Sequence, residues 1–251
     1  MKINDTERHR IMTPDYEVKY KLRSSDFDCC SRLLPSAIMD FFQSAAGAHS
    51  AQLGCSSQDL IKKNLLWVVM RLKFEVLGQP EFYSEIISRT WPLPASRMGY
   101  TRQHVLEDME GRTLVKGLTE WIVMDAETRK LTQVESMYPP EMKFRTDRVI
   151  EGRLKRLREF EPEGEAHIIC PGYSALDLNG HVNNTKYADF VMDALKPGRD
   201  ENIKSFQIDF HRELKCGSRV QVCSRRDGNI IRCKGINDEG FSAFMCNVEL
   251  G

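Results

Sequence analysis

Residues 177–195, DLNGHVNNTKYADFVMDAL, lead from a polar loop into an apolar helix, and they decide the fold. Asn183 or Asn184 is the expected N-cap, because an Asn side chain can bond the free N–H groups of a first helical turn. Pro197 and Gly198 end the helix. Its apolar side chains recur at the spacing of one buried helix face: Tyr187, Phe190, Val191, Ala194 and Leu195.

The same order of elements occurs in the first half of the chain. Residues 16–23 alternate as a strand does, a polar loop follows, and residues 34–45 repeat the helical spacing. A shift of 149 residues places Asp28 on Asp177 and Asp40 on Asp189. Four strand-like runs follow each helix, at residues 65–77, 83–91, 99–107 and 112–125 and at residues 204–213, 218–226, 229–236 and 241–249.

This order predicts an α+β fold, because a long helix and a curved antiparallel sheet can each bury one face against the other. The hot-dog fold has this architecture, and the repeated pattern predicts two tandem hot-dog domains. We expect an N-terminal domain over residues 1–138 and a C-terminal domain over residues 166–251, with a linker at residues 139–165.

The linker contains a basic segment, residues 143–158 (KFRTDRVIEGRLKRLR), with seven basic and two acidic side chains. It is typical of a solvated linker helix. It could also guide an acidic partner, because the chain as a whole is neutral and would have to place positive charge locally. The candidate residues for that surface are Arg153, Lys155 and Arg156.

Composition indicates a soluble protein of the cytoplasm. Thirty-six basic side chains balance 36 acidic ones, which argues against a globally basic nucleic-acid binder. The longest apolar run, residues 65–70, is far shorter than the ~20 residues of a membrane span. The first twelve residues do not have the pattern of a signal or transit peptide. Eight cysteines without a C-x-x-C motif indicate reduced thiols.

Several common site motifs are missing from the sequence. It contains no phosphate-binding G-x-x-x-x-G-K-[ST], no G-x-S-x-G and no zinc-type His spacing. We therefore expect neither a metal nor an organic cofactor.

The densest polar cluster is the loop at residues 177–184. Asp177, Asn179 and His181 alternate along it and could converge on one reacting group. The neighbouring Asn183 and Asn184 serve equally well as structural or as substrate-binding residues. A second group of polar side chains follows at Asp209, His211 and Glu213, where strand alternation predicts that all three lie on an exposed face.

Residues 177–190 (DLNGHVNNTKYADF), residues 210–213 (FHRE) and the block at residues 64–124 resemble the acyl-acyl carrier protein (acyl-ACP) thioesterase family. The resemblance covers residues 16–250. It implies tandem hot-dog domains that hydrolyse the thioester between a fatty acyl chain and the phosphopantetheine arm of a carrier protein. It also implies catalytic roles for Asp177, Asn179, His181 and Glu213, and an acyl pocket shaped by the first domain.

One difference from the plant members concerns the nucleophile. Those members often carry a Cys directly after the glutamate, where this chain has Leu214. We therefore expect a water molecule activated by Asp177 or Glu213, with an oxyanion donor at the start of the helix. His181 would polarise the carbonyl or protonate the thiolate. The expected acyl-pocket residues are Trp67, Met70 and Met98.

Three alternatives remain open at this stage. The enzyme could act on acyl-CoA, because CoA is anionic too and would also suit the basic segment. It could instead be a hydratase of the same fold. A non-catalytic acyl-binding module is the third alternative. Two chains could also associate as a homodimer, although the tandem already completes one hot-dog pair.

Overall fold

Ten antiparallel strands form one continuous sheet in the computed structural model, which describes residues 13–97, 99–132 and 136–251. The strand order across the sheet is β1-β3-β4-β5-β2-β7-β10-β9-β8-β6. The first five strands are β1 (Tyr16–Lys21), β2 (Leu65–Val76), β3 (Glu85–Pro92), β4 (Tyr100–Asp108) and β5 (Thr113–Asp125). The other five are β6 (Glu163–Ile169), β7 (Ile203–Phe210), β8 (Val220–Asp227), β9 (Ile230–Ile236) and β10 (Ser242–Leu250).

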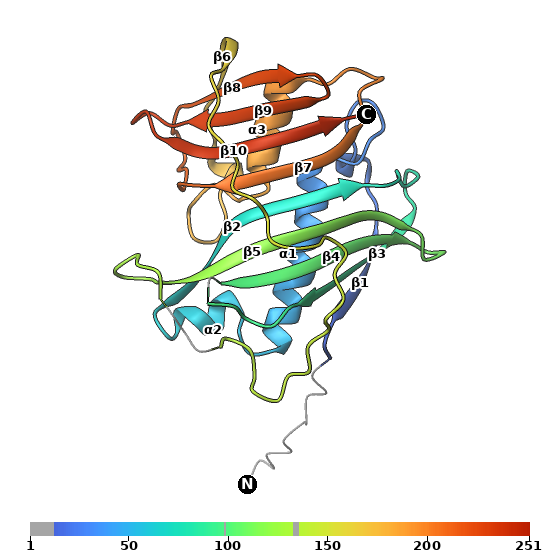
Figure 1. Cartoon of the computed structure of the whole chain (residues 1–251), viewed down its shortest axis with the longest axis vertical. Coiled ribbons are helices and arrows are strands. Elements are labelled where there is room, and N and C mark those ends of the chain that lie inside the picture. Colours follow the sequence, from blue (N-terminus) through green and yellow to red (C-terminus); the bar gives the residue numbers. More distant parts are fainter. Residues whose placement is uncertain (1–12, 98, 133–135) are drawn as a thin grey trace.

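Each half of the sheet packs against one main helix. Helix α1 (Pro35–Gln52) covers the first half and α3 (Lys186–Leu195) the second, and both lie behind the sheet in Figure 1. The halves join where β2 pairs with β7, with Arg71 opposite Asp209. This is the predicted tandem hot-dog fold, and the predicted strands are found within a few residues of their expected bounds. The short helix α2 (Ser57–Ile61) was not predicted.

The loops before the two main helices have the same hydrogen bonds, which confirms the shift of 149 residues. Asp28 Oδ1 accepts the N–H groups of Cys30 and Arg32, at 2.8 and 2.9 Å. Asp177 Oδ1 accepts those of Asn179 and His181, at 2.8 and 3.2 Å. Each loop therefore closes on an aspartate that holds two backbone donors.

Helix α3 begins later than predicted, because Asn183 completes a turn in front of it. The side-chain oxygen of Asn183 accepts the N–H of Thr185 at 3.1 Å, and its carbonyl accepts that of Lys186 at 2.9 Å. The helix starts at Lys186 with Thr185 as N-cap. Asn183 therefore bonds a free N–H of the first turn, as predicted for a capping residue, two residues before the assigned N-cap.

The basic segment is not a helix. Residues 143–160, here called the strap, run in irregular conformation across the outer face of the sheet, in front of the strands in Figure 1. Side chains of the strands bond its backbone: Glu120 accepts the N–H of Leu154 at 3.1 Å, and Gln207 donates to the carbonyl of Lys155 at 2.8 Å. Because the sheet satisfies these groups, the segment does not need helical hydrogen bonds.

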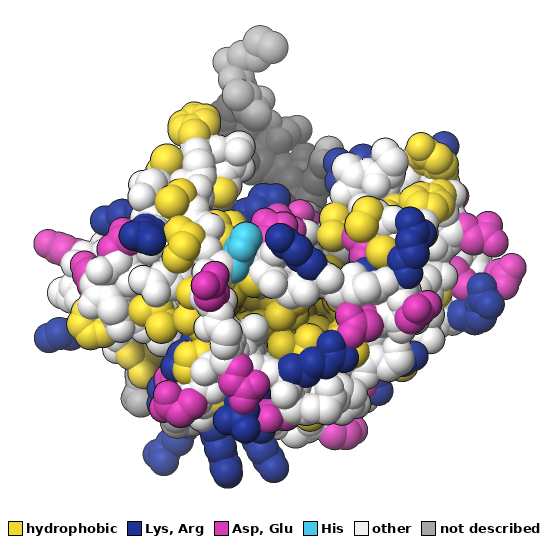
Figure 2. All heavy atoms as spheres, turned by 90° about the horizontal axis from the view of Figure 1, so that it is seen from above, with side chains coloured by type: hydrophobic (Ala, Val, Ile, Leu, Met, Phe, Trp, Pro, Cys, Tyr) yellow, Lys and Arg dark blue, Asp and Glu magenta, His cyan; other side chains and the backbone are white. Residues whose placement is uncertain are grey.

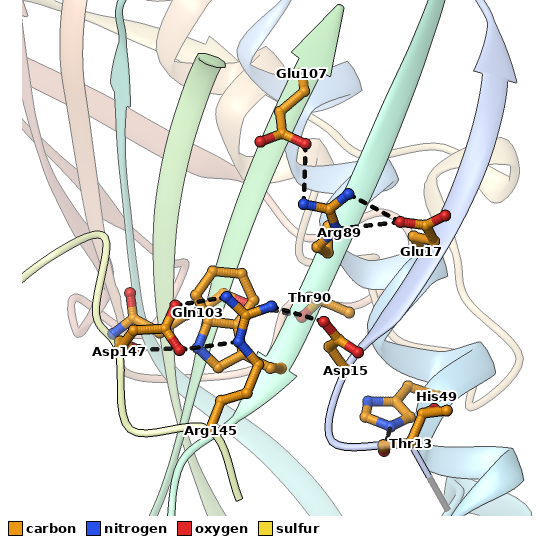
Figure 3. A network of polar contacts seen from close by, with 11 residues as sticks. Thr13, Asp15, Glu17, His49, Arg89, Thr90, Gln103, Glu107, Arg145 and Asp147 are labelled. Carbon is orange, nitrogen blue, oxygen red and sulfur yellow. Dashed lines mark hydrogen bonds and ion pairs between the residues drawn. The ribbon is translucent and has the colours of Figure 1, made fainter. Parts of the chain in front are cut away.

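A second set of contacts fixes the beginning of the strap. Arg145 donates to Asp147 and to Asp15, and its guanidinium lies 4.1 Å from the centre of the Trp91 ring. In Figure 3 the side chain of Arg145 reaches from the strap to Asp15, just before β1, and lies near Gln103. Gln103 bonds the backbone of residues 149 and 150 at 3.1 Å. The strap is thus bound to four strands or more along its length.

Asp209 is buried, which corrects the prediction of an exposed face. Only 1% of this residue is exposed, and its carboxylate accepts from Arg71 Nε at 3.3 Å and from the N–H of Leu157 at 2.9 Å. His211 is half-buried and only Glu213 is exposed, because β7 ends at Phe210 and strand alternation does not extend to these residues. The strap covers the face that the sequence pattern assigned to solvent.

Candidate active site

An open cleft of about 1670 Å³ lies where the two halves of the sheet meet. It is lined by the loop before α3, by β2 and β5, and by one side of α1. Figure 2 shows acidic and basic side chains interspersed on one face of the molecule, with hydrophobic side chains inside a hollow near its centre. The cleft brings together most of the predicted site residues: Asp177, Asn179, His181, Glu213, Trp67, Met70, Asn183 and Asn184.

Three predicted residues fall elsewhere. Met98 lies outside the residues that the structure describes. Arg153 and Lys155 are exposed on the strap and do not line the cleft, whereas Arg156, also exposed, reaches its edge.

Asp177 organises the loop that carries the candidate catalytic groups. Its Oδ1 accepts the two loop N–H groups described above, and within the described ranges its Oδ2 accepts only the amide of Asn179, at 3.4 Å. Asn237 forms the same kind of turn in a β-hairpin, with Oδ1 accepting from Glu239 and Phe241. The turn therefore needs only one side-chain oxygen and no negative charge, which leaves Oδ2 of Asp177 free for chemistry.

His181 and Glu213 meet at the mouth of the cleft. His181 Nε2 lies 3.4 Å from Glu213 Oε2, and the side chains are 27% and 43% exposed. The same Oε2 also forms an ion pair with Arg129. Arg129 belongs to the turn after β5, at residues 125–131, and the sequence analysis did not assign it a role. Arg129 and Glu213 are 84 residues apart in the sequence, so no local sequence pattern could have predicted that they pair.

Tyr187 is a second residue whose role the sequence analysis missed. Its phenol accepts the N–H of Leu214 at 3.1 Å and donates to the carbonyl of Arg212 at 3.3 Å. Burial raises the pKa of Tyr187, so the phenol stays protonated and keeps its donor. Tyr187 therefore fixes the backbone on both sides of Glu213, and its helical spacing had indicated only a core residue.

The start of α3 supplies a backbone donor. Among the described residues no acceptor bonds the N–H of Asn184, which lies one residue before the N-cap. Asn184 lines the cleft and also a small inner cavity of about 20 Å³ between α1 and the sheet. Phe42, Val69 and Trp121 line the same inner cavity, which has room for about one water molecule.

The cysteines are free thiols outside this geometry. Leu214, next to Glu213, is buried, and Cys216 is exposed two residues further on. Burial raises the pKa of Cys233 to about 12 and that of Cys246 well above its ordinary value. In the described part of the chain, no three His, Cys, Asp or Glu side chains are grouped so that they could hold a metal ion.

Comparisons with known proteins agree over most of the chain. The family model of the acyl-ACP thioesterase N-terminal domain matches residues 14–140, and that of the C-terminal domain matches residues 160–243. A chloroplastic palmitoyl-acyl carrier protein thioesterase of Arabidopsis thaliana is 24% identical over 217 residues, which cover 80% of this chain. The alignment covers 52% of that relative, so the chain spans about half the length of the curated relatives it matches.

Solved structures show the same fold. An acyl-ACP thioesterase from Bacteroides thetaiotaomicron aligns with a TM-score of 0.84 and 19% identity, over 95% of this chain and 98% of that one. The 12:0-ACP thioesterase from Umbellularia californica aligns with a TM-score of 0.83 and 20% identity, again over 95% of this chain and 98% of that one.

None of the helices in the described ranges is both long and apolar enough to cross a bilayer.

Proposed function

We propose that this chain, which belongs to the acyl-ACP thioesterase family, hydrolyses fatty acyl-carrier thioesters to free fatty acid and carrier protein. The observation that carries this proposal is the placement of His181 3.4 Å from Glu213 in the cleft that also holds the Asp177 loop. This arrangement offers two carboxylates, an imidazole and a carboxamide to one reacting group.

Asp177 is the proposed general base. Its Oδ2 has Asn179 as its only hydrogen-bond partner among the described residues, whereas Oε2 of Glu213 faces the positive charge of Arg129. The oxygen of Asp177 is therefore open to a water molecule, whereas that of Glu213 is occupied by Arg129 and His181. Asn179 would then hold the attacking water beside Oδ2 of Asp177.

His181 and Asn184 are the proposed partners of the thioester. The water attacks the thioester carbonyl, and the unpaired N–H of Asn184 stabilises the oxygen that becomes negative. His181, oriented by Glu213, donates a proton to the sulfur as the carbon–sulfur bond breaks. Trp67, Met70 and Asn183 line the cleft beside this centre and would contact the bound substrate.

Hydrolysis assays with two carriers test the proposal. One acyl chain is presented on acyl carrier protein and on CoA, and the release of free fatty acid is measured. We expect a higher kcat/KM on the carrier protein. Equal or better turnover of the CoA thioester would favour an acyl-CoA thioesterase, and binding without release would indicate an acyl-binding module.

The strap is the proposed docking surface for the acidic carrier. Arg153, Lys155 and Arg156 are exposed on it, and Arg156 reaches the edge of the cleft. Reversing all three to Glu should raise KM for acyl-carrier substrates at low salt and leave kcat nearly unchanged, because such charges act on association. Short pantetheine thioesters are the control. A KM equal to wild type on the carrier would remove these residues from docking.

Three further predictions belong to this proposal. The domain at residues 1–138 would form the acyl pocket, and the domain at residues 166–251 would carry the catalytic residues. The linker at residues 139–165 would dock the carrier. Eight free cysteines support a reducing compartment, for which we propose the cytoplasm. Association of two chains stays a prediction, which sedimentation analysis would check.

A further inference from the structure

The interior between α1 and the first half of the sheet contains a group of buried polar side chains, here called the inner polar patch. Arg102 and His104 lie two residues apart on β4 and therefore point to the same face. Arg102 is 4% exposed and His104 is 1% exposed. The remaining members of the patch are His49 on α1, Thr90 on β3 and Thr119 on β5.

Arg102 has only neutral partners in the described part of the chain. It donates to His49 Nδ1 at 3.1 Å and to Thr90 Oγ1 at 3.4 Å, and it also bonds the side chain of Tyr138. Arginine has no acceptor atom, so Nδ1 of His49 must accept and Nε2–H must donate to the carbonyl of Thr13, at 3.2 Å. Thr13, His49 and Thr90 are seen together in Figure 3. The histidine is thus neutral and cannot compensate the buried cation.

His104 carries an atom with an unmet hydrogen bond. Its Nε2 lies 3.0 Å from Thr119 Oγ1, and its buried Nδ1 has no hydrogen-bond partner among the described residues. Buried cations without a counter-charge and buried polar atoms without a partner both cost stability. A buried cation with no carboxylate partner and a polar atom with no bond, both among the described residues and on one strand, favour a polar ligand at this face.

Arg102 faces the cleft proposed for the acyl chain, and His104 faces the small inner cavity next to it. Arg102 lines the cleft beside Tyr100 and Tyr138, and His104 lines the inner cavity. The two spaces share Val69 and Trp121 as lining residues. Strand β4 is separated from β7, which leads to Glu213, by three strand spacings, or about 14 Å. Arg102 therefore lies across the sheet from Glu213, whereas His104 shares the inner cavity with Asn184.

We propose that the cleft binds acyl chains that carry a hydrogen-bonding oxygen, a hydroxyl or a carboxylate, remote from the thioester, and that Arg102 donates to this oxygen. The proposal rests on the thioesterase function proposed above. The guanidinium fork suits a carboxylate or hydroxyl oxygen, and the neutral His104 can complete the site through Nδ1. A methyl-ended chain would offer Arg102 no anionic or hydroxyl partner and would leave Nδ1 of His104 without a hydrogen bond.

A panel of thioesters of one chain length tests the proposal. Methyl-ended, hydroxyl-ended and carboxylate-ended chains are compared on the same carrier. We expect kcat/KM for the better oxygenated chain to exceed that for the methyl-ended chain by about tenfold or more, because a site built to bond an oxygen rejects an analogue that lacks it. A methyl-ended chain that is hydrolysed best would overturn the proposal while leaving the thioesterase function intact.

Arg102→Met should abolish the preference and bring the ratio of oxygenated to methyl-ended turnover to about one or below. Buried charges often tolerate replacement by apolar side chains of similar volume, so this variant is expected to fold. Arg102→Lys provides a second variant that should retain part of the preference. The control is Arg89→Met on the neighbouring strand, where Arg89 forms surface ion pairs with Glu17 and Glu107 (Figure 3).

Binding separates this inference from the proposed function. Non-hydrolysable amide analogues of the same three chains are titrated by calorimetry into the wild-type protein and into Arg102→Met. Tighter binding of an oxygenated chain by the wild type, lost in Arg102→Met, supports the inference even if no thioester is hydrolysed. Equal binding of all three chains by the wild type excludes it.

Discussion

Replacing Asp209 by Asn should destabilise the whole protein. Asp209 lies where β2, β7 and the strap meet, and one of its oxygens accepts from both Arg71 and the backbone of Leu157. Arg71 also bonds Glu120 at 3.0 Å, so one arginine links two buried carboxylates. The variant keeps the shape of the side chain but removes its charge. Its NH₂ group would also face N–H donors, those of Arg71 and Leu157 or that of Gln207. Breaking a buried ion pair on one side costs about 3 to 5 kcal/mol, which is our estimate for the loss of unfolding free energy.

Urea unfolding measures this loss, with Asp227→Asn as the matched control. Asp227 also lies between two arginines, Arg225 and Arg232, at 3.1 and 3.2 Å, but its side chain is 32% exposed. Exposed pairs contribute about 1 kcal/mol or less, so the control should unfold close to wild type. If both variants lose the same small amount, the reasoning that burial makes Asp209 important is refuted.

The remaining predictions concern catalysis and pH. His181→Ala and Asp177→Asn should each lower kcat by about 100-fold or more with the fold intact, as expected of positioned acid–base groups; a variant that keeps over half of the turnover would remove its residue from the mechanism. Cys216→Ala should keep most activity, and iodoacetamide inactivation that substrate prevents and that maps to Cys216 would contradict a water mechanism. Burial and the neighbouring Arg102 lower the pKa of His49 to about 4, below the unfolded value of about 6.5. The stabilising contribution of neutral His49 is therefore complete above pH 6.5 and is lost as the pH falls toward 4. Across this window His49→Gln should lose less unfolding free energy than the wild type. Equal losses in the two proteins would exclude His49 as a source of the pH dependence.

The strands and main helices could be predicted because their signals are local. Periodicity of apolar residues and turn residues such as Asp227-Gly228 depend on neighbours within a few positions, and the hairpin between β8 and β9 is found there. The burial of Asp209 could not be predicted, because it depends on a strap that comes from some fifty residues earlier in the chain. Strand alternation identifies the face of a side chain but not what covers that face.

The candidate site divides in the same way. Asp177, Asn179 and His181 lie within five residues, and their common loop made them visible in the sequence. The ion pair of Arg129 with Glu213 and the two hydrogen bonds of Tyr187 connect segments that only the folded sheet brings together. Residues that position a catalytic group are therefore harder to predict than the group itself.

The pairing of β2 with β7 also determines how many open edges the molecule presents. Two separate sheets would leave four edge strands with unpaired N–H and C=O groups, which can recruit strands from other molecules. The continuous sheet leaves two, β1 and β6. β1 alternates Glu17, Lys19 and Lys21 with apolar residues, and β6 begins with Glu163 and carries Glu165. Charged side chains at an edge oppose the addition of a further strand, so the sheet is protected from growing into aggregates at both ends.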